Sequence, residues 1–204
     1  MDAKMKGMVM AAMSALCLIL GIMGAMGNTW LVPDSDEDMD GMEAGAGLTS
    51  SWVEMDAETA EMCDMMVEMM EGEGDAECDG SMLTMTMSFS DGCDDGDDEA
   101  CDMATGGMIG TIGMWAGVVC ALLITLTMVL PMAGVDAMDA VPEMATKVAT
   151  WGAGALMLVG MLGWYFMLPD GGDMELGMSG LMAGAAMTIG LGSAAIGQFI
   201  PENE

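Results

Sequence analysis

Cysteines and carboxylates are the residues of this chain whose type and spacing could do chemistry. The tract "DGCDDGDDEACD", residues 91–102, contains seven carboxylates and two cysteines, Cys93 and Cys101, and no basic residue. Two further cysteines, Cys63 and Cys78, precede it in the same polar segment. Thiols so placed could form disulfides, exchange them or bind a metal, and the carboxylates could bind cations. Which of these reactions can occur depends on the helices and strands that hold the cysteines and carboxylates, and on the cellular compartment that these residues face.

A second acidic motif resembles the start of a calcium loop. Asp36, Asp38 and Asp40, followed by Gly41, have the D-x-D-x-D-G spacing in which alternate carboxylates converge on a hard cation, so they are candidate metal ligands. The twelfth position, where a glutamate supplies two oxygens, is Gly47. We therefore expect weak, diffuse binding of Ca²⁺ rather than a dedicated site, and no other cofactor.

The sequence offers few residues for other kinds of catalysis. The chain has no histidine, the commonest general base, and its 32 methionines are as frequent in apolar runs as in the polar segment, which indicates a general apolar role rather than a Cu(I) site. A membrane thiol–disulfide oxidoreductase stays an alternative. Such enzymes use closely spaced C-x-x-C pairs, whereas here 14, 14 and 7 residues separate successive cysteines. We expect a protein that is not an enzyme.

Four long uncharged runs organise the chain: 7–33, 103–135, 148–169 and 176–201. Each exceeds the roughly 20 residues that a helix needs to cross a membrane. They predict an all-α membrane protein, a bundle of four transmembrane helices with a small, disulfide-containing, partly β outer domain between helices 1 and 2. The expected parts are residues 1–33 (N-terminus and helix 1), 34–102 (acidic loop domain) and 103–204 (helices 2–4, short loops and C-terminus).

The three lysines give the orientation. Lys4, Lys6 and Lys147 flank the starts of the first and third runs, so the positive-inside rule places both termini in the cytoplasm of a multi-pass cell-membrane protein. Residues 34–102 and the short loop 169–177 are then extracytoplasmic. Cleavage of the first run as a signal peptide near Gly27 is the alternative, but the run is long for one, and we expect a retained helix.

The acidic loop carries 24 of the 33 acidic residues, and the net charge of −30 excludes nucleic acid as a partner. A salt-adapted proteome would explain this acidity without a function for it. In an oxidising compartment the four loop cysteines are expected as two disulfides. Three pairings are possible, and we favour Cys63–Cys78 and Cys93–Cys101, which join sequence neighbours.

The pattern of the loop predicts a small mixed fold. Apolar and polar residues alternate over 81–90, as in a strand with one buried face, and 28–32 and 48–55 are shorter strand candidates. Methionines at helical spacing predict a helix within 56–70, with Asp56 as its N-cap. The stretches 34–46 and 71–80 are expected to be flexible and acidic.

Small residues three or four apart in the runs predict close helix packing. The expected partners are the lipid bilayer and, through these small-residue faces and the outer domain, further copies of the chain or other membrane proteins. Trp30 and Trp164–Tyr165 fall at the outer ends of their runs and Trp151 at an inner end, the positions of an aromatic belt.

The order of features resembles the claudin-like tetraspan family. After the first run come Trp30, then Gly47–Leu48, then Trp52, and then the cysteines of the loop, followed by three more runs with a short second outer loop. The resemblance implies a sheet-bearing outer domain on a left-handed bundle, with Trp30, Gly47, Leu48 and Trp52 as an interface motif. It also implies contacts side by side or between cells. We therefore expect a structural, adhesive or interaction role, with an outer divalent-cation-binding or sensing module as a further alternative.

Overall fold

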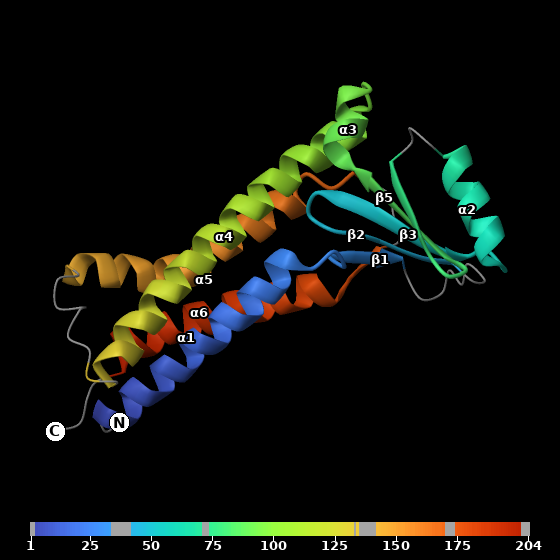
Figure 1. Ribbon diagram of the computed structural model, residues 1–204. Helices are drawn as coiled ribbons and strands as arrows, with labels where there is room; N and C mark the ends of the chain where they lie inside the picture. Colours follow the sequence, from blue (N-terminus) through green and yellow to red (C-terminus); the bar gives the residue numbers. More distant parts are fainter. Residues whose placement is uncertain are drawn as a thin grey trace. The chain divides into compact units, whose positions relative to one another are not determined.

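The structure is a computed structural model that describes residues 3–33, 42–70, 74–132, 134, 142–169 and 174–200. Four long apolar helices dominate it: α1 (Ala3–Met26), α4 (Asp98–Met132), α5 (Glu143–Tyr165) and α6 (Met178–Phe199) (Figure 1). Two short helices and a small antiparallel sheet complete the described part of the chain. The expected mostly helical chain with four long apolar helices, a small sheet and two disulfides is confirmed.

The chain divides into two compact units. The helical unit comprises residues Met1–Met26, Ile109–Gly163 and Leu181–Glu204. The sheet unit comprises Gly27–Met108 and Trp164–Gly180. The sheet unit therefore includes both the long polar segment and the short loop between α5 and α6.

The four long helices contain apolar stretches that are long enough to cross a membrane: Met5–Met26, Asp98–Pro131, Met144–Tyr165 and Met178–Phe199. The second stretch begins earlier than the expected 103, because Asp97 caps α4. Its Oδ1 accepts the backbone N–H groups of Glu99 and Ala100 at 2.9 and 3.3 Å. Asp98 and Glu99 in the first turn also favour the positive end of the helix dipole.

Glycines set the packing inside the helical unit, as the small-residue pattern predicts. A Cβ placed on Gly113 of α4 would lie 2.5 Å from the Cα of Gly160 in α5. A Cβ on Gly154 of α5 would lie 2.6 Å from the backbone nitrogen of Leu191 in α6. Backbones that approach this closely gain dispersion contacts along their whole length. The helices pair through backbone contact at these positions.

Large apolar side chains lie on both the inner and the outer faces of the long helices. Met114 and Met157 are fully buried between helices. Ile112, Val159 and Leu181, by contrast, expose more than half of their surface. A water-facing helix would carry polar residues on its outer face, so these outer faces need an apolar medium to cover them.

The sheet unit is built on six antiparallel strands in the order β4-β5-β3-β2-β1-β6. Their bounds are Leu31–Pro33 (β1), Met42–Ala46 (β2), Ser50–Asp56 (β3), Asp75–Asp79 (β4), Met82–Ser88 (β5) and Met174–Leu176 (β6). The longest pairing joins β3 to β5, from Ser50 opposite Ser88 to Asp56 opposite Met82. The strands expected at 28–32, 48–55 and 81–90 are present as β1, β3 and β5, although β1 begins only at Leu31 and β5 ends at Ser88.

Helix α2 (Ala60–Met69) covers one end of the sheet, against β4 and β5 (Figure 1). The core beneath it is small and centres on Ala57, Cys63 and Leu83. The alternating residues of β5 are accordingly buried to different degrees. Leu83 is fully buried under α2, whereas Met87 exposes about half of its surface. The single buried face predicted for this strand is thus covered only in part.

Two local expectations are wrong. Met42–Ala46 and Asp75–Asp79, expected to be flexible, are strands because each pairs along its length with a neighbour. The N-cap of α2 is Thr59, whose Oγ1 accepts the backbone N–H of Met62, whereas Asp56 accepts the N–H of Glu58 in a local turn. The short loop before α6 contains β6, which pairs with β1.

Candidate functional site

Trp30 lies at the centre of the sheet unit. Its indole packs edge to face on Trp164, with ring centroids 4.9 Å apart, and both side chains are almost completely buried. Its backbone N–H donates to the Ala46 carbonyl at 2.8 Å, and its carbonyl accepts the N–H of Gly177 at 2.8 Å. Trp30 and Trp164 therefore do not form part of an aromatic belt facing the bilayer. They join the two loop segments of the unit to each other.

The other residues of the predicted interface motif surround this pair. Gly47 and Leu48 are buried, and the Leu48 carbonyl lies so close to Gly107 of α4 that no side chain fits there. Trp52 of β3 is half-buried, and its Nε1 donates to the Asn28 carbonyl at 2.9 Å. The residues of the motif thus pack close together in the sheet unit, and Trp52 is the one that is partly exposed.

Two disulfides brace the sheet unit: Cys63–Cys78, which joins α2 to β4, and Cys93–Cys101, which closes the turn between α3 (Phe89–Asp94) and α4. These are the pairs favoured from the sequence. Cys63 is fully buried in the core under α2. The first bridge therefore fastens the helix to an edge strand.

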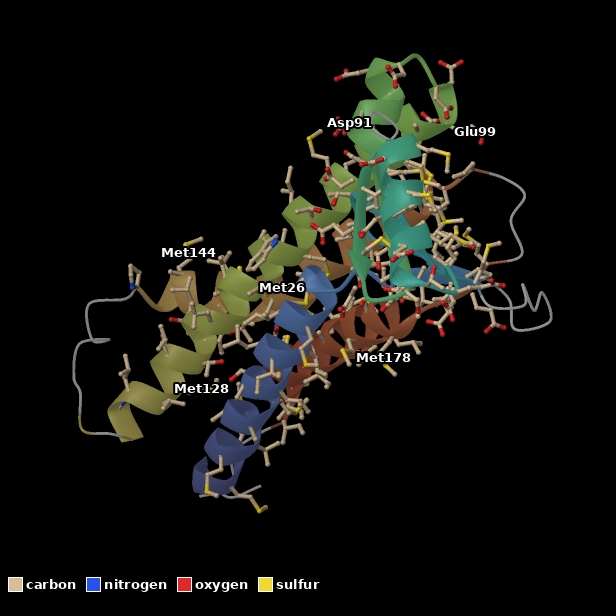
Figure 2. All side chains as sticks on the ribbon, turned by 45° about the vertical axis from the view of Figure 1, so that its right-hand side comes forward. Met26, Asp91, Glu99, Met128, Met144 and Met178 are labelled. Carbon is tan, nitrogen blue, oxygen red and sulfur yellow. A yellow bond between two sulfur atoms is a disulfide. The ribbon has the colours of Figure 1, made fainter. Side chains whose placement is uncertain are left out.

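The acidic tract 91–102 forms the turn between α3 and α4. All seven of its carboxylates are exposed, and Figure 2 shows them spread outward around Asp91 and Glu99. The backbone of the turn closes through Gly96, which has a positive φ of 91° and donates to the Cys93 carbonyl. With its cysteines joined in a disulfide, the tract offers a solvated anionic surface rather than a reactive thiol.

Methionines on α2 form an exposed apolar row in the sheet unit. Met62, Met65 and Met69, spaced three and four residues apart, lie on one face of the helix and expose 38%, 56% and 77% of their surface. We call these three residues the α2 ridge. Exposed carboxylates flank it, namely Glu61, Asp64 and Glu68. Flexible, polarizable thioethers on a surface suit contact with a partner.

No group of three or more cysteine, aspartate or glutamate side chains within the described ranges is arranged to hold a metal ion. The predicted calcium motif Asp36, Asp38 and Asp40 lies outside the residues that the structure describes. Weak cation binding by the acidic loop therefore stays a prediction.

The helical unit contains a hollow of about 510 Å³ between α1, α5 and α6. Met10 and Trp151 supply apolar walls, and Lys147, Thr150 and Gln198 supply polar groups. The indole of Trp151 donates to the Gln198 Oε1 at 2.9 Å across the two helices. A hollow of this size and mixed lining can hold a small amphiphilic molecule.

Sequence reasoning missed both the α2 ridge and the hollow. The spacing of the methionines in 56–70 predicts a helix, but it does not distinguish the methionines that are buried from those that are exposed. Met66 and Met70 pack on the core, whereas the α2 ridge faces outward. The hollow joins residues from three separate runs, and no local pattern signals such a meeting.

No protein-family model matches the chain, and no curated protein sequence matches it.

Proposed function

We propose that this chain is a four-span membrane protein whose acidic outer unit makes protein–protein contacts in the cell envelope. In this proposal α1, α4, α5 and α6 cross the membrane, both termini are cytoplasmic, and the sheet unit faces the extracytoplasmic space. Its role is structural or adhesive rather than catalytic.

The exposed apolar faces of the long helices support the membrane assignment. Side chains such as Ile112 and Val159 would cost free energy in water, about 25 cal/mol per Å² of apolar surface, whereas lipid covers them without that cost. The close glycine contacts inside the helical unit are the kind of packing that holds helices together in lipid. The two disulfides suit an oxidising outer compartment.

The α2 ridge carries the proposed contact role. A small acidic unit gains solubility from carboxylates, so three neighbouring methionines that expose up to 77% of their surface need a reason to face outward. A partner that buries them would remove that apolar area from water. Glu61, Asp64 and Glu68 beside the ridge favour a partner surface that carries lysine or arginine around an apolar centre.

A distant relation to the claudin-like tetraspan family forms part of the proposal. The sheet unit has the kind of architecture that this resemblance implies, and Trp30, Gly47, Leu48 and Trp52 come together in it. Because Trp30, Gly47 and Leu48 are buried, we propose that the shared motif stabilises the outer unit, while contacts are made elsewhere on its surface.

Site-specific photo-crosslinking tests the contact role. A photoreactive amino acid replaces Met65 in the full chain, which is expressed in its native membrane and irradiated. Replacement of Glu77, an exposed residue of the edge strand β4 in the same unit, is the matched control. We expect a discrete crosslinked product from position 65 and none from position 77.

The salt dependence of that product identifies the partner. A product with a basic protein should weaken as salt screens the attraction, whereas a product with a second copy should strengthen, because carboxylates would face carboxylates. Equal, diffuse labelling from both positions, or no product from position 65, would contradict a contact surface on α2.

A further inference from the structure

The hydroxyl of Ser193 is buried in the helical unit without a hydrogen-bond partner among the described residues. The residue lies in the middle of α6 and exposes 4% of its surface. A buried hydroxyl without a partner costs free energy, about 1–3 kcal/mol in protein cores. A bound water molecule would remove this cost.

Beside Ser193 lies a small cavity to which all four long helices contribute. Ser14 and Cys17 come from α1, Ala121 and Ile124 from α4, Thr150 from α5 and Ser193 from α6. The room for the centre of a water molecule is about 10 Å³, enough for one water and too little for a larger molecule.

The polar groups around the cavity have unused hydrogen-bonding capacity. Ser14 donates its hydroxyl proton to the Ala11 carbonyl at 3.0 Å, and Thr150 donates its own to the Thr146 carbonyl at 2.7 Å. Both hydroxyl oxygens therefore keep lone pairs that can accept a hydrogen bond. Ser193 can donate its own proton.

We propose that a single water molecule occupies this cavity and joins α1, α5 and α6 through hydrogen bonds. The water accepts a hydrogen bond from the Ser193 hydroxyl and donates one hydrogen bond each to the Ser14 and Thr150 oxygens, so all three hydroxyl groups have partners. Three hydrogen bonds are the usual number for a buried water. The bundle is then linked at its centre by a bound solvent molecule as well as by glycine contacts.

The chemistry of the lining selects water over a metal ion. A sodium or calcium ion takes about six or more oxygen ligands, and no carboxylate among the described residues lines the cavity to offset its charge. Thr150 also lines the larger hollow between α1, α5 and α6.

The substitution Ser193→Ala tests the proposal through the sign of its effect. If the water is present, the variant removes one of its three hydrogen bonds, and we expect the midpoint of thermal unfolding to fall by about 2–4 °C. If the cavity is empty, the variant removes an unpaired hydroxyl and the midpoint rises. Thr188→Ala on the same helix is the control, because Thr188 is exposed and bonds only to the Ala185 carbonyl in its own helix.

A direct measurement accompanies the unfolding. Solid-state NMR of the full chain in lipid detects transfer of magnetisation from water to nearby backbone amides. We expect early transfer to the Ser193 amide and none to that of Ala186, which is fully buried on the same helix and does not line the cavity. A raised or unchanged midpoint of Ser193→Ala, or equal absence of transfer at both amides, would overturn the proposal.

Discussion

Replacement of Gly113 by alanine measures how much the close approach of α4 and α5 contributes to the helical unit. The added Cβ would lie 2.5 Å from the Gly160 Cα and 2.8 Å from the Leu156 carbonyl oxygen. Both contacts are with backbone, so no side chain can rotate away, and the two helices must separate locally by about 1 Å to reach ordinary contact. Overpacking of this kind costs about 1–3 kcal/mol.

Gly184→Ala is the matched control. A Cβ on Gly184, inside α6, meets only the Met161 Cε at 3.8 Å, an ordinary van der Waals contact. Both variants share the gain of about 1 kcal/mol that alanine has over glycine in a helix. The difference between their free energies of unfolding therefore isolates the overpacking, and we expect Gly113→Ala to be the less stable by about 1–3 kcal/mol.

The assay is unfolding of the purified full chain in mixed micelles titrated with sodium dodecyl sulfate, followed by tryptophan fluorescence. Equal stability of the two variants would show that α4 and α5 can separate without cost. That result would refute the argument that glycine-mediated backbone contact holds the helical unit together.

Three further predictions concern the sheet unit and the orientation of the chain. Replacing Cys63 and Cys78 by serines should destabilise the sheet unit by about 3 kcal/mol. The loss should be slightly larger than that from removing the Cys93–Cys101 disulfide, because the Cys63–Cys78 disulfide closes the longer loop. Denaturant unfolding followed by circular dichroism measures both losses of stability, and the reverse order would contradict the loop-closure argument. A cysteine introduced at Asp136 should stay unlabelled by a membrane-impermeant thiol reagent on intact cells, whereas one at Asp97 should react; labelling at Asp136 would reverse the proposed orientation. Asparagine at all three aspartates of 36–40 should leave calcium binding weak and almost unchanged in isothermal titration calorimetry, whereas loss of a saturable sub-millimolar site would reveal a dedicated calcium loop.

The long helices could be predicted from the sequence because their signal is local. An uncharged run longer than the hydrocarbon core leaves few alternatives to a helix, and the described helices follow those runs closely. Two boundaries differ from the runs. The first run continues to residue 33, but α1 ends at Met26 and Leu31–Pro33 form strand β1. At the start of α4, Asp97 caps the helix and extends it into the acidic tract. A run of carboxylates is typical of a loop, but carboxylates are also favourable in the first turn of a helix, so composition alone did not locate the start of α4.

The sheet was only partly predictable, because some of its strands depend on their neighbours. The alternation in β5 identifies a strand by itself, but "MEAGA" in β2 and "DAECD" in β4 are rich in residues that disfavour strands. They are strands because β3 and β5 supply paired edges beside them. The role of Trp30 was hidden for a similar reason, since its partner Trp164 lies far away along the chain.

The pairing of β1 with β6 has a consequence for biosynthesis. Leu31 pairs with Leu176, so the edge of β1 has no partner until the ribosome has made almost the entire chain. At 5–20 residues per second this interval lasts roughly 7–30 s. During it the nascent sheet unit presents an open strand edge, a common starting point for misassembly. A chain truncated before β6 would keep that edge open, which would give cellular quality control a means of distinguishing incomplete chains from finished ones.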